Sequence, residues 1–270
     1  MAERTLEHAY ETVNLHRRGG ELRLELNRPD SMNAWDRQLG QDLLAAVERA
    51  AQDPSVRAVV ITGAGRGFSS GADLKAGFDP TPEGRPDVGS ALRERYHPII
   101  TGIRRMEKPV LAAVNGPAVG IGFSLALACD LVIARESAYF LLAFVNIGLV
   151  PDGGSSLFVP TRIGQARASE LALLGEHLPA AKALEWGLIN RVTADADFDA
   201  EVDALAARLA AGPTRSYAGS KRQLNAMSHA RMDDQLELEA AVQQEMAGSE
   251  DFIEGVEAFL AKRPPEFTGR

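Results

Sequence analysis

The stretch from Asn115 to Asp130, NGPAVGIGFSLALACD, constrains the fold more than any other part of the chain. An apolar run at 110–114 precedes it and is typical of a buried strand. Three glycines then remove side chains from the turn, and the apolar segment 123–129 is typical of a helix buried on nearly all sides. The free N–H groups at such a helix start can bind an anion or a developing oxyanion. Taken alone, however, the stretch is explained more simply by a tight turn with close helix packing.

The composition predicts an ordinary globular protein. The chain has 270 residues, enough for one large domain or a domain with an appendage, and its net charge of −8 argues against a general nucleic-acid binder. Cys129 is the only cysteine and the histidines show no metal-binding spacing, so we expect neither a disulfide nor a metal site. The N-terminal segment has no apolar signal core and no apolar run reaches membrane-spanning length, so we expect a cytoplasmic protein without a membrane partner.

Short apolar runs alternate with amphipathic segments along the first half of the chain, which predicts an α/β fold. Helices dominate from about residue 154, and the proline-rich segment 79–89 is predicted to be a mobile surface loop or lid. The strands are predicted at 13–15, 21–26, 58–62, 110–114, 131–134 and 138–142, and the first two helices at 36–51 and 90–106.

A second glycine-rich loop, GAGRGFSSG at 63–71, follows the strand AVVIT. It is not a dinucleotide-binding fingerprint, because its third glycine comes one position early, and it has no Walker lysine. We expect both glycine loops to follow a strand, to precede a helix and to converge on one atom. Two backbone N–H donors aimed at a carbonyl oxygen would form an oxyanion hole, in which removal of one donor typically costs about 2.7–4 kcal/mol of transition-state stabilisation. Such a site suits enolate chemistry on a thioester.

Several ordered motifs resemble the crotonase, or enoyl-CoA hydratase/isomerase, family. They are FSSGADL and NGPAVGIG, together with LNRPDSMNA, EWGLINRV and EGVEAFLAKRPPEF. The resemblance covers nearly the whole chain. It implies a crotonase-like spiral of ββα units over 1–200, followed by a helical C-terminal oligomerisation region over 201–270. It also implies an acyl-CoA thioester substrate, no separate cofactor, and assembly as a homotrimer or hexamer.

The resemblance assigns the two oxyanion donors to the N–H groups of Ala72 and Ile121. The positions of the two glutamates of family hydratases are occupied here by Ser124 and Phe144. Water activation and protonation of the α-carbon normally need two acid/base groups, so ordinary hydration is not expected.

Asp152, in LVPDGGSS, offers a carboxylate nearby. The segment resembles Δ3,Δ2-enoyl-CoA isomerases and, more closely, ring-epoxide phenylacetyl-CoA isomerases, in which a single acid carries the proton. The alternative is that Asp152 is the N-cap of the next helix, a role typically worth about 1 kcal/mol. The two roles are compatible, and the resemblance favours the base.

Three further residues are candidates for binding coenzyme A. By resemblance, Lys262 matches a position whose ammonium contacts a CoA phosphate, often from a neighbouring subunit. Phe259, on the same predicted helix, would line the adenine pocket, and Lys75 is a weaker contact candidate. By residue type alone, a solvated terminal lysine is the more common role for Lys262.

The sequence therefore predicts an acyl-CoA isomerase that shifts a double bond through an enolate, with ring-epoxide isomerisation of an aryl-CoA as a related reaction. Two alternatives stay open: an enoyl-CoA hydratase with atypical acid/base groups, and a non-catalytic acyl-CoA binder that lost both glutamates. The sequence does not disclose the acyl group.

Overall fold

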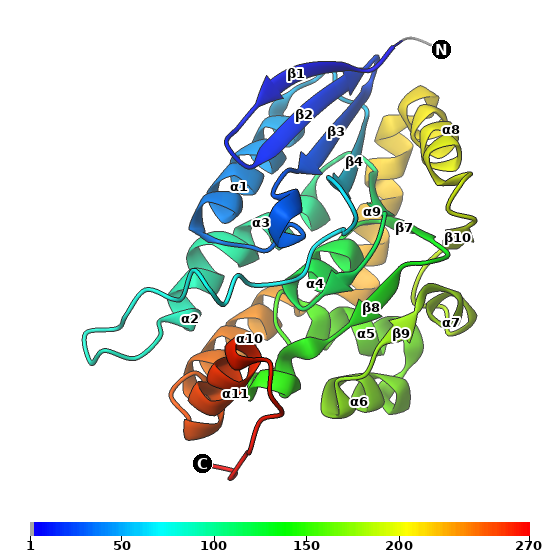
Figure 1. Ribbon diagram of the computed structural model, residues 1–270. Coiled ribbons are helices and arrows are strands. Elements are labelled where there is room, and N and C mark those ends of the chain that lie inside the picture. The colour runs from blue at the N-terminus through cyan, green and yellow to red at the C-terminus, as the bar shows by residue number, and fades with distance from the viewer. Residues whose placement is uncertain (1–2) are drawn as a thin grey trace.

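The computed structural model describes residues 3–270, and a seven-stranded sheet organises them (Figure 1). The strands β1 (Thr5–Ala9), β2 (Val13–Arg18) and β3 (Glu21–Leu26) pair antiparallel. The sheet continues in parallel from β3 through β4 (Ala58–Gly63), β5 (Val110–Val114), β7 (Leu131–Arg135) and β10 (Arg191–Thr193). The strands predicted at 13–15, 21–26, 58–62, 110–114 and 131–134 are confirmed. The prediction missed β1, whose residues are only partly buried or exposed and so show no apolar alternation.

A second, three-stranded sheet lies beside the functional loops. It consists of β6 (Ala118–Val119), β8 (Tyr139–Leu141) and β9 (Leu178–Pro179). The first two strands are parallel and the last pair is antiparallel. Because β6 belongs to the stretch NGPAVGIG, this sheet fixes the turn that enters the buried helix.

The first helix confirms its prediction closely. It is α1 (Arg37–Gln52), and the Asp36 carboxylate caps it by accepting from the Leu39 N–H at 2.8 Å. The helix predicted at 90–106 is interrupted: α2 (Val88–Ala91) and α3 (His97–Arg105) flank a π-helical segment, Leu92–Tyr96. Pro98 has no N–H to donate to the carbonyl four residues earlier, which explains the wider turn at this point.

The buried helix is α4 (Ile121–Ala128), and all eight of its residues are buried. As predicted, the chain beyond it is mainly helical (Figure 1). These helices are α5 (Ser155–Ile163), α6 (Gln165–Leu174), α7 (Ala180–Glu185), α8 (Phe198–Ala211), α9 (Thr214–Ser228), α10 (Met232–Met246) and α11 (Glu250–Ala261). In the part of the chain that the structure describes, none of the helices is both long and apolar enough to cross a bilayer.

The two faces of the large sheet bury different helices. On one face, β2–β5 and β7 share a large apolar core with α1, α3 and α4, and this core extends to Leu236, Ala240 and Phe252 of α10 and α11. On the other face, Val60, Leu111 and their neighbours pack against α8 through Phe198 and Val202. The helices α10 and α11 therefore join the core that also holds the glycine loops.

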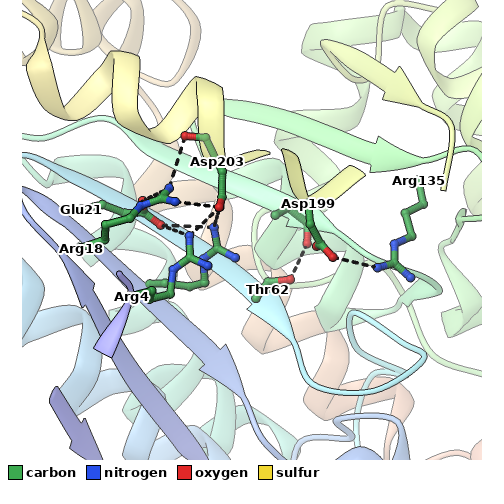
Figure 2. Close-up of polar contacts among 9 residues, drawn as sticks. Arg4, Arg18, Glu21, Thr62, Arg135, Asp199 and Asp203 are labelled. Carbon is green, nitrogen blue, oxygen red and sulfur yellow. Dashed lines mark hydrogen bonds and ion pairs between the residues drawn. The ribbon is translucent and has the colours of Figure 1, made fainter. Parts of the chain in front are cut away.

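Polar contacts attach α8 to the N-terminal hairpin (Figure 2). Arg4 and Arg18 converge on Asp203 of α8, at 2.5 and 2.7 Å, and both also contact the buried Glu21 carboxylate. Because several charges share these contacts, burial of the network costs less free energy than burial of an isolated ion pair would.

Gly122 offers a test of the packing between the glycine loops. A Cβ added to it would lie 2.6 Å from the Ser69 Cβ, although alanine is intrinsically the better helix former. We expect Gly122→Ala to lower the free energy of unfolding by about 1–3 kcal/mol through this overlap. The control is Gly219→Ala in α9, where an added Cβ has no neighbour within 4 Å. Chemical denaturation should show a gain of up to about 1 kcal/mol for the control. A stabilised Gly122→Ala variant would contradict the close approach.

Candidate active site

The two glycine-rich loops are hydrogen-bonded to one another. The N–H groups of Phe68 and Ser69 donate to the Pro117 carbonyl oxygen at 3.1 and 3.0 Å, and the Val119 N–H donates to the Ser69 oxygen at 2.9 Å. The loops therefore converge as expected. The expectation that both precede a helix is wrong for the first loop. Ala72 forms an isolated bridge with Trp35, and a turn follows in which the Ala76 N–H donates to the Asp73 oxygen at 3.0 Å.

Two buried asparagine side chains hold the first loop in shape. The Asn33 amide donates to the carbonyl oxygens of Ala64 and Gly67 at 3.0 and 2.9 Å. From the second loop, the Asn115 amide donates to the Gly65 oxygen at 3.1 Å and accepts from the Gly63 N–H at 3.2 Å. These side chains satisfy backbone groups that a glycine turn would otherwise leave unpaired.

The N–H groups of Ala72 and Ile121 are left over by this arrangement. The neighbours of Ala72 bond to Trp35: Gly71 accepts from its N–H at 2.7 Å, and Asp73 donates to its oxygen at 2.9 Å. Ile121 is the first residue of α4, so its N–H has no acceptor within the helix. Among residues 3–270, neither N–H donates to a backbone oxygen of a turn, loop or cap. Ala72 and Ile121 line the same cavity.

This cavity has a volume of about 410 Å³ and is lined mainly by apolar side chains. Phe144, Tyr96 and Leu149 form part of its wall. Asp152 also lines it, so the residues that carry the two backbone N–H donors and the buried carboxylate all border one cavity. An apolar cavity with a few polar groups is typical of a small-molecule site.

The backbone of Asp152 is held by three donors. Its carbonyl oxygen accepts from the Ser124 hydroxyl at 2.7 Å, and from the hydroxyl and N–H of Ser155 at 2.8 and 3.1 Å. Gly153 adopts a positive φ of 61°, and a Cβ on it would lie 2.9 Å from the Ser124 Cβ. Ser124 therefore anchors the segment that carries Asp152, and this packing leaves little room for a longer side chain at Ser124.

The Asp152 side chain is 5% exposed, and its Oδ2 accepts from the Gln243 amide of α10 at 2.7 Å. Its Oδ1 has no hydrogen-bond partner among the residues that the structure describes. The N-cap interpretation of Asp152 is wrong: α5 follows Gly154, at a φ of 84°, and no side chain at that position caps it. The Glu239 carboxylate of α10 bonds the helix start instead, accepting from the N–H groups of Gly154 and Ser156 at 2.8 and 3.1 Å.

Burial dominates the electrostatics of this acid. Burial and, to a smaller extent, the nearby Glu239 charge raise the pKa of Asp152 to about 8, against the opposing effect of the Gln243 hydrogen bond. Burial also raises the pKa of Glu239 to about 7, against its bonds to Ser156 and Gly154. Two carboxyl groups therefore share a buried region in which ionisation of one disfavours ionisation of the other. A carboxyl group with a pKa near neutrality can both accept and return a proton.

The three predicted CoA contacts lie in different surroundings. Phe259 of α11 is 58% exposed and lines the cavity, whereas Lys262 is exposed beyond the helix end, which falls at Ala261 rather than after Lys262. Arg263 lines the cavity in its place within this chain. Lys75 is exposed in the turn after Ala72 and does not line the cavity.

Sequence reasoning missed Glu239, Gln243 and Arg263. The first two lie four residues apart in LELEAAVQQEM, so they share one helix face. Polar residues at this spacing usually face solvent, and only the tertiary packing shows that these are buried. Arg263 directly follows Lys262 in the C-terminal motif EGVEAFLAKRPPEF.

The raised pKa of Asp152 predicts a pH-dependent effect on stability. Because the folded-state pKa lies above the unfolded value, folding favours the protonated acid, and this stability is lost as the pH rises from about 4 through about 8. Near pH 4, the free energy of unfolding of Asp152→Asn should equal that of the wild type. Near pH 9 it should be higher than that of the wild type, by about 1.4 kcal/mol for each unit by which folding raises the Asp152 pKa. Denaturant titrations across this range measure the difference. Asp233→Asn, an exposed carboxyl on α10, should show no such growing gain, and a constant difference for Asp152→Asn would contradict the raised pKa.

Comparison with known proteins identifies the family of this chain. The sequence profile described as enoyl-CoA hydratase/isomerase matches residues 17–270. A "Probable enoyl-CoA hydratase" of Rhodobacter capsulatus is 44% identical over 97% of this chain and 100% of its own. A "1,2-epoxyphenylacetyl-CoA isomerase" of Escherichia coli is 40% identical over 96% of this chain and 99% of its own. A crystal structure of an enoyl-CoA hydratase from Mycobacterium avium subsp. paratuberculosis superposes with a TM-score of 0.88 at 41% identity, covering 96% of this chain and 100% of that one. The protein therefore has the crotonase fold and belongs to the enoyl-CoA hydratase/isomerase family.

Proposed function

We propose that the protein is an acyl-CoA isomerase that shifts a carbon–carbon double bond through an enolate. One observation carries the proposal: a single buried carboxylate, Asp152, lines the same cavity as the unpaired N–H groups of Ala72 and Ile121. Neither of the two positions that carry glutamate in family hydratases supplies an acid here: Ser124 hydrogen-bonds the Asp152 backbone, and Phe144 is apolar. One acid suffices for isomerisation, because the proton removed is the proton returned.

In the proposed reaction, the thioester oxygen accepts hydrogen bonds from Ala72 and Ile121, which stabilise negative charge on that oxygen. The ionised Asp152 takes a proton from one carbon, and the C–H electron pair passes into the conjugated enolate. The same carboxyl group then returns the proton two carbons away, so the double bond moves and no atom is gained or lost. The pKa of Asp152, about 8, makes both transfers feasible near neutral pH.

The acyl group that fits best is an aryl or other bulky apolar group. The cavity walls are largely apolar, and the similarity to the Escherichia coli protein named for 1,2-epoxyphenylacetyl-CoA supports an aryl-CoA. On an epoxide, the same enolate stabilisation would support ring expansion. The CoA moiety would lie toward Phe259 and Arg263 at the cavity rim, with Lys262 contributed by a neighbouring subunit and Lys75 by the turn after Ala72.

Assembly through the C-terminal helices is part of the proposal. Exposed apolar side chains gather on α6, α9 and α11, where a monomer would leave them in water; they are Leu173, Leu174, Leu224, Met227, Ile253, Phe259 and Leu260. We expect a trimer or hexamer by light scattering, and a monomer would remove the shared CoA pocket.

Asp152→Asn tests the assignment of the base. The amide retains size and hydrogen-bonding capacity but cannot carry the proton, so double-bond migration should slow by about 10²–10⁴-fold. A panel of enoyl-CoA and aryl-CoA thioesters, followed spectroscopically, measures the rate. Asp233→Asn, on the exposed side of α10, should retain wild-type activity. An Asp152→Asn variant that isomerises at an unchanged rate would refute the mechanism.

Hydration is the second candidate, because the Rhodobacter capsulatus relative is named a probable hydratase and Glu239 supplies another buried acid near Asp152. Crotonyl-CoA in isotopically labelled water separates the two reactions. We expect double-bond migration without addition of the labelled oxygen, since Glu239 is engaged with the start of α5. Rapid incorporation of the label would establish hydration, and thioester binding without any turnover would indicate a non-catalytic binder.

A further inference from the structure

Two residues of α10 enclose the segment that carries Asp152. Glu239 and Gln243 lie four residues apart, so they are neighbours on one helix face, and they are 2% and 0% exposed. Glu239 contacts the chain after Asp152, at Gly154 and Ser156, whereas Gln243 contacts the chain before it and the carboxylate itself. Neither residue lines the cavity, so both act on substrate only through Asp152.

The hydrogen bonds fix the orientation of the Gln243 amide. Its Oε1 accepts from the Val150 N–H at 3.3 Å, which leaves Nε2 to donate to Asp152 Oδ2 at 2.7 Å. A donor stabilises the ionised carboxylate. Glu239 acts in the opposite direction, because its negative charge disfavours ionisation of Asp152.

We infer that Glu239 and Gln243 are positioning residues that hold the Asp152 carboxyl group and set its charge state from opposite directions. The inference rests on the proposed function, because it takes Asp152 as the proton carrier. Gln243 keeps Oδ2 occupied, which leaves the buried Oδ1 as the carboxyl oxygen without a hydrogen bond among the described residues. Glu239 raises the share of the protonated acid near neutral pH, and the protonated acid is the form that returns the proton.

The other groups near Asp152 do not set the charge state of its carboxyl group. Ser124 of α4 and Ser155 of α5 contact only its backbone oxygen. Tyr96, in the π-helical segment, is the remaining titratable neighbour. Burial and the Asp152 charge raise the pKa of Tyr96 above its usual value, so Tyr96 stays neutral over the range in which Asp152 titrates.

Glu239→Gln and Gln243→Met test the inference by the pH dependence of isomerisation. The wild-type rate should rise with pH through an inflection near 8, as Asp152 ionises. Glu239→Gln keeps an acceptor for the α5 start but removes the charge, so the inflection should fall by about one pH unit, and the rate near pH 7.5, where Glu239 is mostly ionised in the wild type, should rise up to about threefold. Gln243→Met removes the donor, so the inflection should rise by a similar amount and the rate at pH 6 should fall.

The matched control is Glu237→Gln. It removes a carboxylate from the same helix, but one whose side chain is 60% exposed and paired with Arg93, and its inflection should stay at the wild-type pH. A merely structural role for Glu239 and Gln243 would lower activity in both variants and leave the inflection in place. Inflections that move in the same direction would overturn the inference, and so would unmoved inflections when the titration of Asp152 itself is also unmoved.

A second measurement separates this inference from the proposed function. The infrared band of the Asp152 carboxyl group, obtained as the difference between each protein and its Asp152→Asn counterpart, reports protonation without turnover. Opposite shifts of this titration together with an unshifted rate profile would uphold the positioning pair and refute Asp152 as the proton carrier. Absence of opposite shifts in the band would overturn the inference itself, whatever the activity.

Discussion

The direct contact between the two glycine-rich loops is the constraint on which the site depends. The three hydrogen bonds that join Phe68 and Ser69 to Pro117, and Val119 to Ser69, use the backbone groups on one side of each loop. Such close approach needs glycine: a Cβ on Gly122 would overlap Ser69. The same contact brings Ala72 and Ile121 to one cavity with unused N–H groups. Loop packing and the candidate oxyanion site are therefore one structural feature, so the two interpretations of this stretch do not compete.

In the proposed reaction, the burial of Asp152 is what would let a single acid both take up and return the proton. Glu and Asp are normally ionised near neutral pH and poor at returning protons, but removal from water raises the pKa of Asp152 to about 8. The cost of this burial is limited because the acid can be protonated, and because Gln243 satisfies one of its oxygens. Ser124 then has a clear role at the position where a hydratase carries glutamate, since its hydroxyl supports the Asp152 backbone instead of supplying a second acid.

The sequence predicted the elements whose signals are local. The strand 110–114, the helix capped by Asp36 and the glycine loops were found because periodicity and turn residues specify them directly. The break at Leu92–Tyr96, the capping of α5 by Glu239 and the support of Asp152 by Gln243 were not found. The last two depend on contacts across 85 and 91 residues, and a polar residue on a helix carries no sign of whether it meets solvent or a distant loop.

The distance along the chain between Asp152 and Gln243 has a consequence for the order in which the site is assembled. The loops that carry Ala72 and Ile121 belong to the first half of the chain, and the hydrogen bonds between these loops involve no residue of the last helices. The hydrogen bond to the Asp152 side chain instead joins residues 91 positions apart, and closing such a long loop carries an entropic cost that is recovered only with the final packing. Removal of α10 would therefore take the Gln243 donor and the Glu239 charge away from Asp152, whereas no hydrogen bond between the glycine loops depends on that helix.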